Sequence, residues 1–392
     1  MNGAIFHQLL TAHGQAALAA ATALNPSEAT FLTCWKQLRK HYPDELANAA
    51  VETAILRIKA RTKFSCADRM YFTREALEQA SSEVVAQHRA RRLAPYCLVA
   101  DLCCGIGSDA LAFAAAGAMV TAIDSDPLRV AMTEANAAAL GYHERVHGVV
   151  GDARTVALPE VQAAFADPAR RTDRRRFLDP EDYLPPLSAI RARFAPDFPL
   201  AVKIAPGVDW SDLPHRDAEV EFVSWGGELK ECVLWFGAAR QVARRATLLP
   251  CGAQLTANEP CQPRPVAPIG AVLYDPDPAL TRAGLVHQLA EQLEAFPIDS
   301  CGPLLSARQR QPTPWASAYG VEQVIPFHRR HLGEYLRSQQ VGRITVIKRG
   351  SLADADALVR CLRLQGSEHR WVFLTYANHQ HVMIVCTHLN CH

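Results

Sequence analysis

The segment Asp101-Leu-Cys-Cys-Gly105-Ile-Gly107-Ser-Asp109 decides the fold of this chain. It continues the short apolar run Cys97–Leu102, and an alanine-rich stretch of helical length follows it. The pattern therefore predicts a strand, a glycine turn and a helix in succession. Glycine at 105 and 107 lets the backbone approach a ligand with no Cβ in the way. The first turn of the helix directs free N–H groups to the same place, so the turn predicts a ligand site.

Strands and helices alternate after this turn. Asp126–Leu140 has the pattern of a helix, and Gly226-Gly227 is a hairpin signal between two strand-like runs. The seven predicted strands are Cys97–Leu102, Met119–Ile123, Val146–Val150, Ala163–Ala166, Leu200–Ile204, Val220–Trp225 and Glu228–Phe236. Alternation of this kind is typical of α/β proteins with a parallel sheet covered on both faces. We expect a seven-stranded mixed sheet that ends in an antiparallel hairpin.

The residues before and after this alternating segment do not continue its pattern of strands and helices. Residues 1–95 carry Ala and Leu at helical spacing, and Thr73 is the predicted N-cap of a helix over Arg74–Arg92. We expect a helical domain at 1–95, a ligand-binding domain at 96–250, a proline-rich linker at 251–269 and an α+β domain at 270–392. The elements predicted in the last domain are helices at Ala279–Ala295, His328–Gln339 and Asp354–Leu364, and strands at Arg343–Lys348, Trp371–Thr375 and His381–Thr387.

Composition excludes several classes of protein. The 392 residues are 49% hydrophobic, and 41 basic against 40 acidic side chains leave a net charge of +1. This excludes a disordered chain and a strongly basic coat for nucleic acid. The longest uncharged apolar run, Ala110–Ile123, is too short to span a bilayer. We see no secretory signal, and the 12 cysteines include no C-x-x-C, so we expect reduced thiols in a cytoplasmic protein.

The Cys and His residues near the C-terminus match no standard zinc spacing, and we predict no metal site. They are His379, His381, Cys386, His388, Cys391 and His392.

Three acidic residues end consecutive predicted strands. Asp101 would repel a pyrophosphate but attract a cationic amino group. Asp124, about 20 residues after the turn, can accept from both hydroxyls of a ribose. Asp152, followed by Ala153, can accept from an adenine amino group. Each Asp alone could simply cap the helix that follows it. Three in register with a glycine turn favour a nucleoside cofactor that carries an aminoacyl arm.

These residues and the terminal hairpin resemble the class I S-adenosylmethionine-dependent methyltransferases over about residues 97–250. Cys103 stands where many members carry glycine, so the turn must accommodate a Cβ. The resemblance implies a Rossmann-like fold and S-adenosyl-L-methionine as the cofactor. It implies cofactor contacts from Asp101, Cys103, Gly105, Gly107, Asp109, Asp124, Ser125, Asp152, Ala153 and Asp167.

A narrower resemblance covers nearly the whole chain. The chain is similar to bacterial methyltransferases with a C-terminal THUMP-like domain, although Ser108 replaces a third glycine and Tyr376 an expected arginine. THUMP domains proper occur in RNA-modifying enzymes, so the resemblance implies an RNA substrate. The motifs that carry it are Leu56-Arg-Ile-Lys-Ala60, Phe72-Thr-Arg-Glu-Ala-Leu-Glu-Gln-Ala80, Asp167-Pro-Ala-Arg-Arg171, Val202-Lys-Ile-Ala-Pro-Gly207 and Leu273-Tyr-Asp-Pro-Asp-Pro-Ala279.

Asp167-Pro168 is the predicted catalytic pair. The Asp167 carboxylate and the residue-168 carbonyl can accept an N–H and so orient a nitrogen lone pair. The pair resembles the (Asp/Asn)-Pro-Pro-aromatic motif of amino-methyltransferases, but Ala169 and Arg170 remove the usual stacking surface. It also resembles the motif of uridine C5-methyltransferases. Those enzymes need a cysteine nucleophile that Val202–Gly207 lacks, so carbon methylation is disfavoured.

The predicted substrate contacts lie after the fourth and fifth strands. Arg170 and Arg171 open a basic run that extends over Arg174–Arg176 and either binds phosphates or forms a solvated loop beside acidic residues. Tyr183 is a candidate for stacking on a base. Lys203 touches substrate or pairs with a nearby acid. Glu228 and Glu231 either face the pocket or are surface charges of the hairpin, and we favour the surface.

We therefore expect a methyltransferase that acts on a base nitrogen in RNA. The near-neutral charge keeps a small metabolite or natural product open as the acceptor. A non-catalytic binder that retains the cofactor fold is the third hypothesis. The sequence predicts no membrane partner and does not give the oligomeric state.

Overall fold

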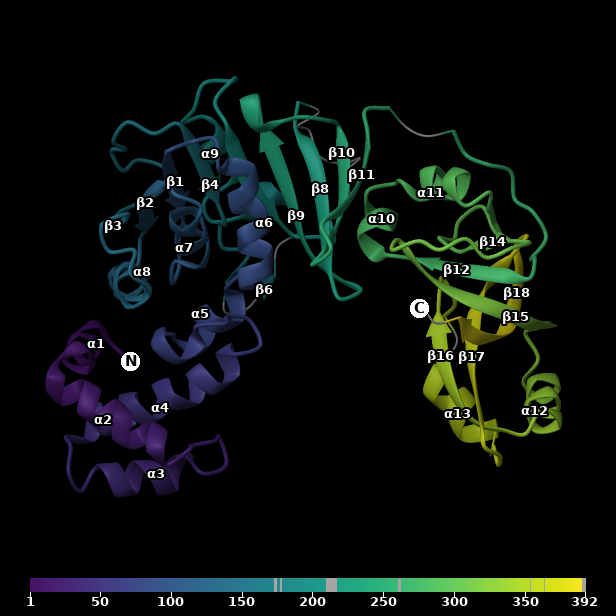
Figure 1. The fold of residues 1–392 in the computed structure, drawn as a ribbon, viewed down its shortest axis with the longest axis horizontal. Helices are drawn as coiled ribbons and strands as arrows, with labels where there is room; N and C mark the ends of the chain where they lie inside the picture. Colours follow the sequence, from purple (N-terminus) through teal and green to yellow (C-terminus); the bar gives the residue numbers. More distant parts are fainter. Residues whose placement is uncertain are drawn as a thin grey trace. The chain divides into compact units, whose positions relative to one another are not determined.

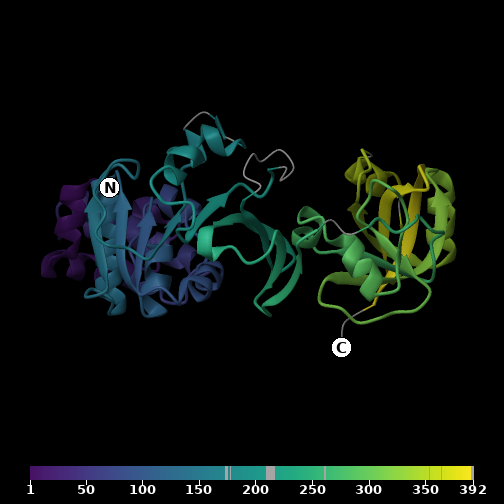
Figure 2. The same cartoon turned by 90° about the horizontal axis from the view of Figure 1, so that it is seen from above.

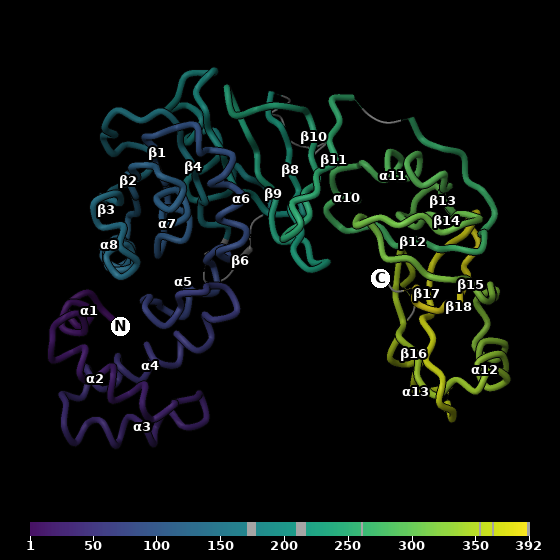
Figure 3. The backbone as a smooth tube through the Cα atoms, viewed as in Figure 1, coloured from purple at the N-terminus to yellow at the C-terminus, as the bar shows by residue number. Residues whose placement is uncertain are grey.

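The computed structural model describes residues 1–172, 175–176, 178–208, 217–259, 262–352, 354–362 and 364–389. The chain forms two compact units (Figures 1 and 3). The first consists of Met1–Val220 and Glu231–Gln241, and the second of Glu221–Lys230 and Val242–His392.

The larger sheet has the predicted mixed topology but two more strands than expected. Its order is β11-β10-β8-β9-β7-β4-β1-β2-β3. The additional strands, β10 (Arg244–Leu249) and β11 (Ala253–Ala257), follow the hairpin, and β11 falls within the expected linker. The remaining strands are β1 (Leu98–Leu102), β2 (Met119–Asp124), β3 (Val146–Val150), β4 (Ala163–Ala166), β7 (Leu200–Ile204), β8 (Glu219–Trp225) and β9 (Glu228–Phe236).

The five strands β3, β2, β1, β4 and β7 are parallel, and β9 runs antiparallel to β7. Helices α7 (Ser108–Ala115) and α8 (Pro127–Leu140) connect the first three strands and pack on them. Because the strands are parallel, β1, β2, β3 and β4 all end at one edge of the sheet. The chain segments that follow these strands therefore lie together.

Helix α8 has clear start and stop signals. Its N-cap is Asp126, whose side chain accepts from Leu128 N at 2.8 Å, and Pro127 occupies the first turn. It ends at Gly141, whose φ of 86° suits the left-handed C-cap.

The N-terminal residues form six helices, and the sheet is not a separate body from them. One hydrophobic core runs from Phe6 in the first helix through Phe113 of α7 to Trp235 of β9. The first helix, which is purple in Figure 1, also contacts α8, and Figure 2 shows the same ribbon from above. The helices are α1 (Gly3–Leu10), α2 (Ala12–Ala23), α3 (Phe31–Leu38), α4 (Asp44–Ala60), α5 (Arg74–Gln79) and α6 (Glu83–Leu93).

The prediction of one continuous helix over Arg74–Arg92 was wrong. Thr73 is the N-cap as predicted, but the chain leaves the helix at Ala80, where ψ is 136°, and α6 begins after Ser82. Lys63 makes this break favourable because its ammonium group binds carbonyl groups at the end of α5.

The second unit contains a seven-stranded sheet, in the order β13-β14-β12-β15-β18-β17-β16. Helices α12 (Arg329–Ser338) and α13 (Ala355–Leu362) both contact β16 and share a core with residues of the sheet. The strands are β12 (Val272–Pro276), β13 (Phe296–Pro297), β14 (Leu305–Ala307), β15 (Ala316–Pro326), β16 (Val341–Lys348), β17 (Glu368–Ala377) and β18 (Gln380–Leu389).

Two details of this unit differ from prediction. The expected helix over Ala279–Ala295 is two helices, α10 (Pro278–Arg282) and α11 (Val286–Gln292), because Gly284 between them has a φ of 67°. Strands β12, β13, β14 and β15 had not been predicted, and β15 is the longest of them. Its residues are polar and apolar without regular alternation, and a bulge at Val321–Gln323 interrupts its register.

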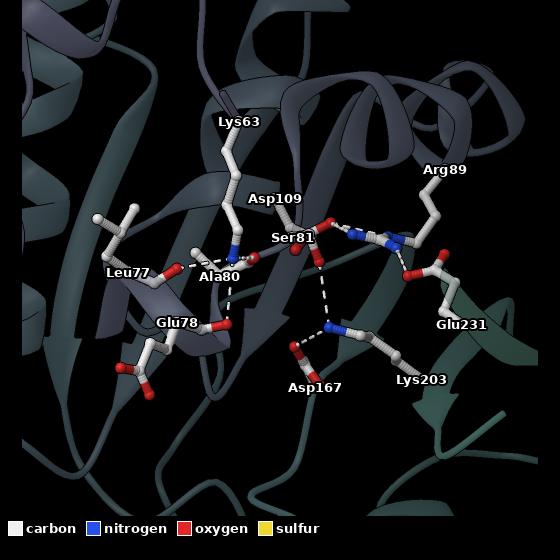
Figure 4. A network of polar contacts seen from close by, with 10 residues as sticks. All are labelled: Lys63, Leu77, Glu78, Ala80, Ser81, Arg89, Asp109, Asp167, Lys203 and Glu231. Atoms are coloured by element: carbon white, nitrogen blue, oxygen red, sulfur yellow. Dashed lines mark hydrogen bonds and ion pairs between the residues drawn. The ribbon is translucent and has the colours of Figure 1, made fainter. Parts of the chain in front are cut away.

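A buried ion cluster joins α6 to the sheet of the first unit. Arg89 is fully buried and donates to Asp109 Oδ1 from Nε at 2.8 Å and from Nη2 at 2.5 Å (Figure 4). Its third nitrogen donates to Glu231 on β9. Burial alone would lower the pKa of Arg89, but the two carboxylates raise it above its ordinary value. The interpretation of Glu231 as a surface charge was therefore wrong.

We predict that Arg89→Met destabilises the protein by about 3–5 kcal/mol, because it leaves two buried carboxylates without their cation. The free energy of unfolding in urea measures the loss. Arg91→Met is the control, since Arg91 lies on the same helix and is exposed. Equal stabilities of the two variants would contradict the prediction.

Candidate active site

The first unit contains a cavity of about 310 Å³ at the edge where the parallel strands end. Nine of the ten residues predicted to contact a cofactor line it, and Gly107 does not. The lining residues are Ala76, Gln79, Ala80, Ser81, Asp101, Cys103, Cys104, Gly105, Ile106, Ser108, Asp109, Asp124, Ser125, Arg129, Asp152, Ala153, Arg154, Asp167, Ala169, Leu184, Pro185 and Pro186.

The glycine turn forms one wall of this cavity. Gly105 has a φ of 59°, and a Cβ there would meet no protein atom within 4 Å, so a ligand can approach its backbone. Gly107 has a different role, because a Cβ there would lie 2.8 Å from Thr133 Cγ2 on α8. Cys103 adopts a φ of 65° despite its Cβ, a conformation that costs about 1–2 kcal/mol. The turn does accommodate a Cβ, as predicted, at the expense of local strain.

Asp101 is an unpaired buried acid at the end of β1. It is 1% exposed, and neither oxygen makes a hydrogen bond of good geometry with another described residue. Burial, followed by the charges of Asp109 and Asp167, raises its pKa well above the ordinary value, while the Ala110 N–H and Arg89 offset part of this. A cation in the cavity would satisfy this carboxylate.

Asp124 is anchored to the glycine turn. Its Oδ2 accepts from Gly105 N at 3.0 Å and its Oδ1 from Asp126 N at 3.0 Å. Burial raises its pKa, and these two N–H groups oppose that effect. Each oxygen can accept a second hydrogen bond, so this carboxylate can bind a pair of hydroxyl groups.

Asp152 is already paired within its own turn. Arg154 donates to it from the backbone at 2.8 Å and from Nη2 at 2.6 Å, and these bonds lower its pKa to about 2. The carboxylate remains at the cavity beside Ala153.

Asp167 follows β4 and faces the same cavity. Its Oδ2 accepts from Lys203 Nζ at 2.7 Å (Figure 4). Ala169 pairs with Leu184 through two backbone hydrogen bonds of 3.0 Å, which brings the segment Leu184–Pro186 to the cavity. Leu184 is 56% exposed, so an acid and an apolar wall lie next to each other.

The other predicted catalytic and substrate residues whose side chains the structure describes are not among those that line the cavity. Pro168 is buried, and Arg170 is partly buried. Tyr183 is fully buried and its hydroxyl accepts from Ala205 N at 3.0 Å, so its ring has no free face for a base. Lys203 pairs with Asp167, one of the two roles expected for it. The side chain of Arg171 and the whole of Arg174 lie outside the described residues.

Among the described cysteines, neither Cys103 nor Cys232 has the character of an activated nucleophile. Cys103 lines the cavity, but burial and then Asp124, Asp167, Asp101 and Asp152 raise the pKa of its thiol well above the ordinary value. Cys232 is buried on β9.

No group of three or more potential metal ligands occurs in the described part of the chain, from which Cys391 and His392 of the C-terminal cluster are missing. Among the described helices, none is long and apolar enough to cross a bilayer.

Residues that no sequence pattern had assigned to the site also line the cavity. Gln79, Ala80 and Ser81 come from the break between α5 and α6, and Leu184–Pro186 from the loop after β6 (Arg175–Arg176). The Ser81-Ser82 pair, which disfavours a helix interior, was the available signal for the first segment. The Ala169–Leu184 pairing is a tertiary contact that no sequence pattern announces.

Three parts of the chain match known protein families. Residues 316–388 match the family described as THUMP domain-like, and residues 97–173 match the RNA cap guanine-N2 methyltransferase family. Residues 4–60 match a domain of unknown function.

Two curated relatives are similar along most of their length. They are uncharacterized S-adenosylmethionine-dependent methyltransferases of Mycobacterium tuberculosis, strains CDC 1551 / Oshkosh and ATCC 25618 / H37Rv. Each is 34% identical over 343 residues, which are 83% of this chain and 91% of the relative. The crystal structure of a "putative methyltransferase" from Porphyromonas gingivalis W83 has a TM-score of 0.74, with 19% identity, over 93% of this chain and 100% of that chain. This last likeness shows the fold.

We predict that Asp101→Asn stabilises the free protein at neutral pH. The raised pKa means that the folded state loses stability as the pH rises from about 3.8 through the pKa of folded Asp101. A neutral amide removes that loss, with a gain of about 1–3 kcal/mol at pH 7. Urea unfolding at pH 4 and pH 7 measures it. Asp68→Asn, which changes an exposed acid, is the control. The prediction would be contradicted if the difference in unfolding free energy between Asp101→Asn and the parent protein were no larger at pH 7 than at pH 4.

Proposed function

The chain belongs to the S-adenosylmethionine-dependent methyltransferases, and from this premise we propose that it methylates a base nitrogen in RNA. Family membership confirms the predicted enzyme class, the cofactor S-adenosyl-L-methionine and the class I fold with a C-terminal THUMP-like domain. The proposal adds the acceptor and the residues that act on it.

The cavity fits this cofactor. The unpaired carboxylate of Asp101 suits the ammonium group of the methionine part, and the second lone pairs of Asp124 suit the ribose hydroxyls. The open space at Gly105 admits the ligand to the backbone. When bound, the cofactor supplies an electrophilic methyl group on a sulfonium. We assign cofactor contacts to Asp101, Cys103, Gly105, Asp109, Asp124, Ser125, Asp152, Ala153 and Asp167, and packing of the turn to Gly107.

One observation carries the acceptor assignment: Asp167 lines the cofactor cavity next to an apolar wall. Ala169, Leu184, Pro185 and Pro186 form this wall, which supports a planar base where the usual aromatic residue is missing. Asp167, with the residue-168 carbonyl, accepts the N–H of the base, orients the nitrogen lone pair and takes up the proton that the nitrogen releases.

Two further facts support RNA as the acceptor. Residues 316–388 match a family described as THUMP domain-like. Residues 97–173 match a family described as RNA cap guanine-N2 methyltransferase. The net charge of +1 is the observation that favours a small molecule instead. Carbon methylation is disfavoured because the Cys103 thiol is held neutral.

We predict that Asp101→Asn weakens cofactor binding at least about tenfold, because it removes the anion that pairs with the ammonium group. Since that cation would lower the raised pKa of Asp101, binding to the parent protein releases a proton, and affinity falls as the pH is lowered. Titration calorimetry in two buffers of different ionisation enthalpy measures both effects. Proton release that persists in Asp101→Asn would count against this role.

We predict that Asp167→Ala lowers methyl transfer about 100-fold at saturating cofactor, because it removes the group that orients the acceptor nitrogen and takes up its proton. The assay is transfer of tritiated methyl groups into total RNA and, separately, into a small-molecule extract. Asp68→Ala, at an exposed acid, is the control. RNA as the acceptor requires that labelling fall steeply between about 50 and 200 mM salt. Label in the extract alone would overturn the proposed substrate.

A further inference from the structure

A loop from the N-terminal helices reaches the cavity. Residues Ala76, Gln79, Ala80 and Ser81, at the end of α5 and just beyond it, contribute to the lining. The family match at residues 97–173 does not include this loop. A part of the chain outside the sheet therefore helps to form the site.

Lys63 fixes the course of this loop. Its Nζ donates to the carbonyl groups of Leu77 at 2.7 Å, Glu78 at 3.1 Å and Ala80 at 3.0 Å (Figure 4). Its own carbonyl accepts from Glu83 N at 2.9 Å, which ties down the start of α6. An ammonium group among carbonyls at a helix C-terminus is favourable on charge and hydrogen-bonding grounds. The chain from Leu77 to Glu83 is thus held at both ends by one residue.

Ser81 lies where this loop meets the end of β7. Its Oγ accepts from Lys203 Nζ at 3.2 Å, and the same nitrogen donates to Asp167 Oδ2 at 2.7 Å (Figure 4). Lys203 is 4% exposed, so its ammonium group depends on these partners for its hydrogen bonds. Held from two sides, the ammonium group binds one oxygen of Asp167 and leaves the other for a ligand.

We propose that Ser81 and Lys203 are positioning residues for Asp167, so that the N-terminal helices complete the acceptor half of the active site. Ser81 acts through Lys203, which holds one oxygen of the Asp167 carboxylate and leaves the other for a ligand, and Lys63 places Ser81. The inference rests on the role proposed above for Asp167.

The test is a double-mutant cycle on the full-length protein. Ser81→Ala, Lys203→Met and the double variant are compared by the rate of tritium transfer at saturating cofactor, into whichever pool the parent protein labels. Exposed Lys36→Met and Ser65→Ala are the matched controls. Titration calorimetry with S-adenosylmethionine reports whether each variant retains an intact cofactor site.

We expect Lys203→Met to lower kcat by about 30–100-fold and Ser81→Ala by about 3–10-fold, with the cofactor Kd changed less than about threefold. Because Ser81 acts through Lys203, the double variant should match Lys203→Met within about twofold. Losses that multiply in the double variant, or a parent rate in Ser81→Ala, would overturn the proposal. Lys63→Met should reproduce the Ser81→Ala loss.

The outcomes separate this inference from the proposed substrate. If the parent protein labels only the small-molecule extract, the RNA proposal fails and the cycle is read on that extract. If it labels RNA and the two losses are independent, the RNA proposal stands and the positioning role is wrong.

Discussion

The confinement of charge is the constraint on which this site depends. Four carboxylates, those of Asp101, Asp109, Asp167 and Glu231, are held largely out of water, and such a group is stable only with enough nearby positive charge. Two buried cations supply part of it. Arg89 binds both Asp109 and Glu231, and Lys203 binds Asp167. Asp101 makes no such contact within the described residues, and in the proposed function the ammonium group of the cofactor supplies the missing cation.

Much of the fold around the cavity could be predicted from the sequence, because it depends on residues close together in the chain. The strand, turn and helix around Gly105 follow from residue type and spacing, and so do the acids that end the strands, since parallel strands share one edge. The buried partners could not be predicted, because Arg89 and Glu231 are 142 residues apart and each resembles a surface charge when read alone. The break after Ala80 was missed for a similar reason: a lysine seventeen residues away stabilises it. Tyr183 shows the opposite error, an aromatic residue near the site that serves the core.

The part of the cavity that we propose binds the methyl acceptor is built from more than one segment of the chain. Asp167-Pro168 lacks the aromatic residue of the amino-methyltransferase pattern, and the two backbone bonds between Ala169 and Leu184 bring a leucine and two prolines to the gap. A surface built by backbone pairing is hard to recognise in sequence, since the pairing does not depend on side-chain identity. Substrate class in such proteins is therefore better sought in the loops that meet at the cavity than in the four residues of the motif.

The unbroken core between the first helices and the strands limits how this protein can be dissected. Phe6, Phe113 and Trp235 belong to one packed interior, so cutting the chain before β1 would expose apolar surface and remove Lys63, Ser81 and Arg89 at the same time. The nucleoside-binding portion and the N-terminal helices therefore fold as one unit, and we expect neither to be stable when it is expressed alone.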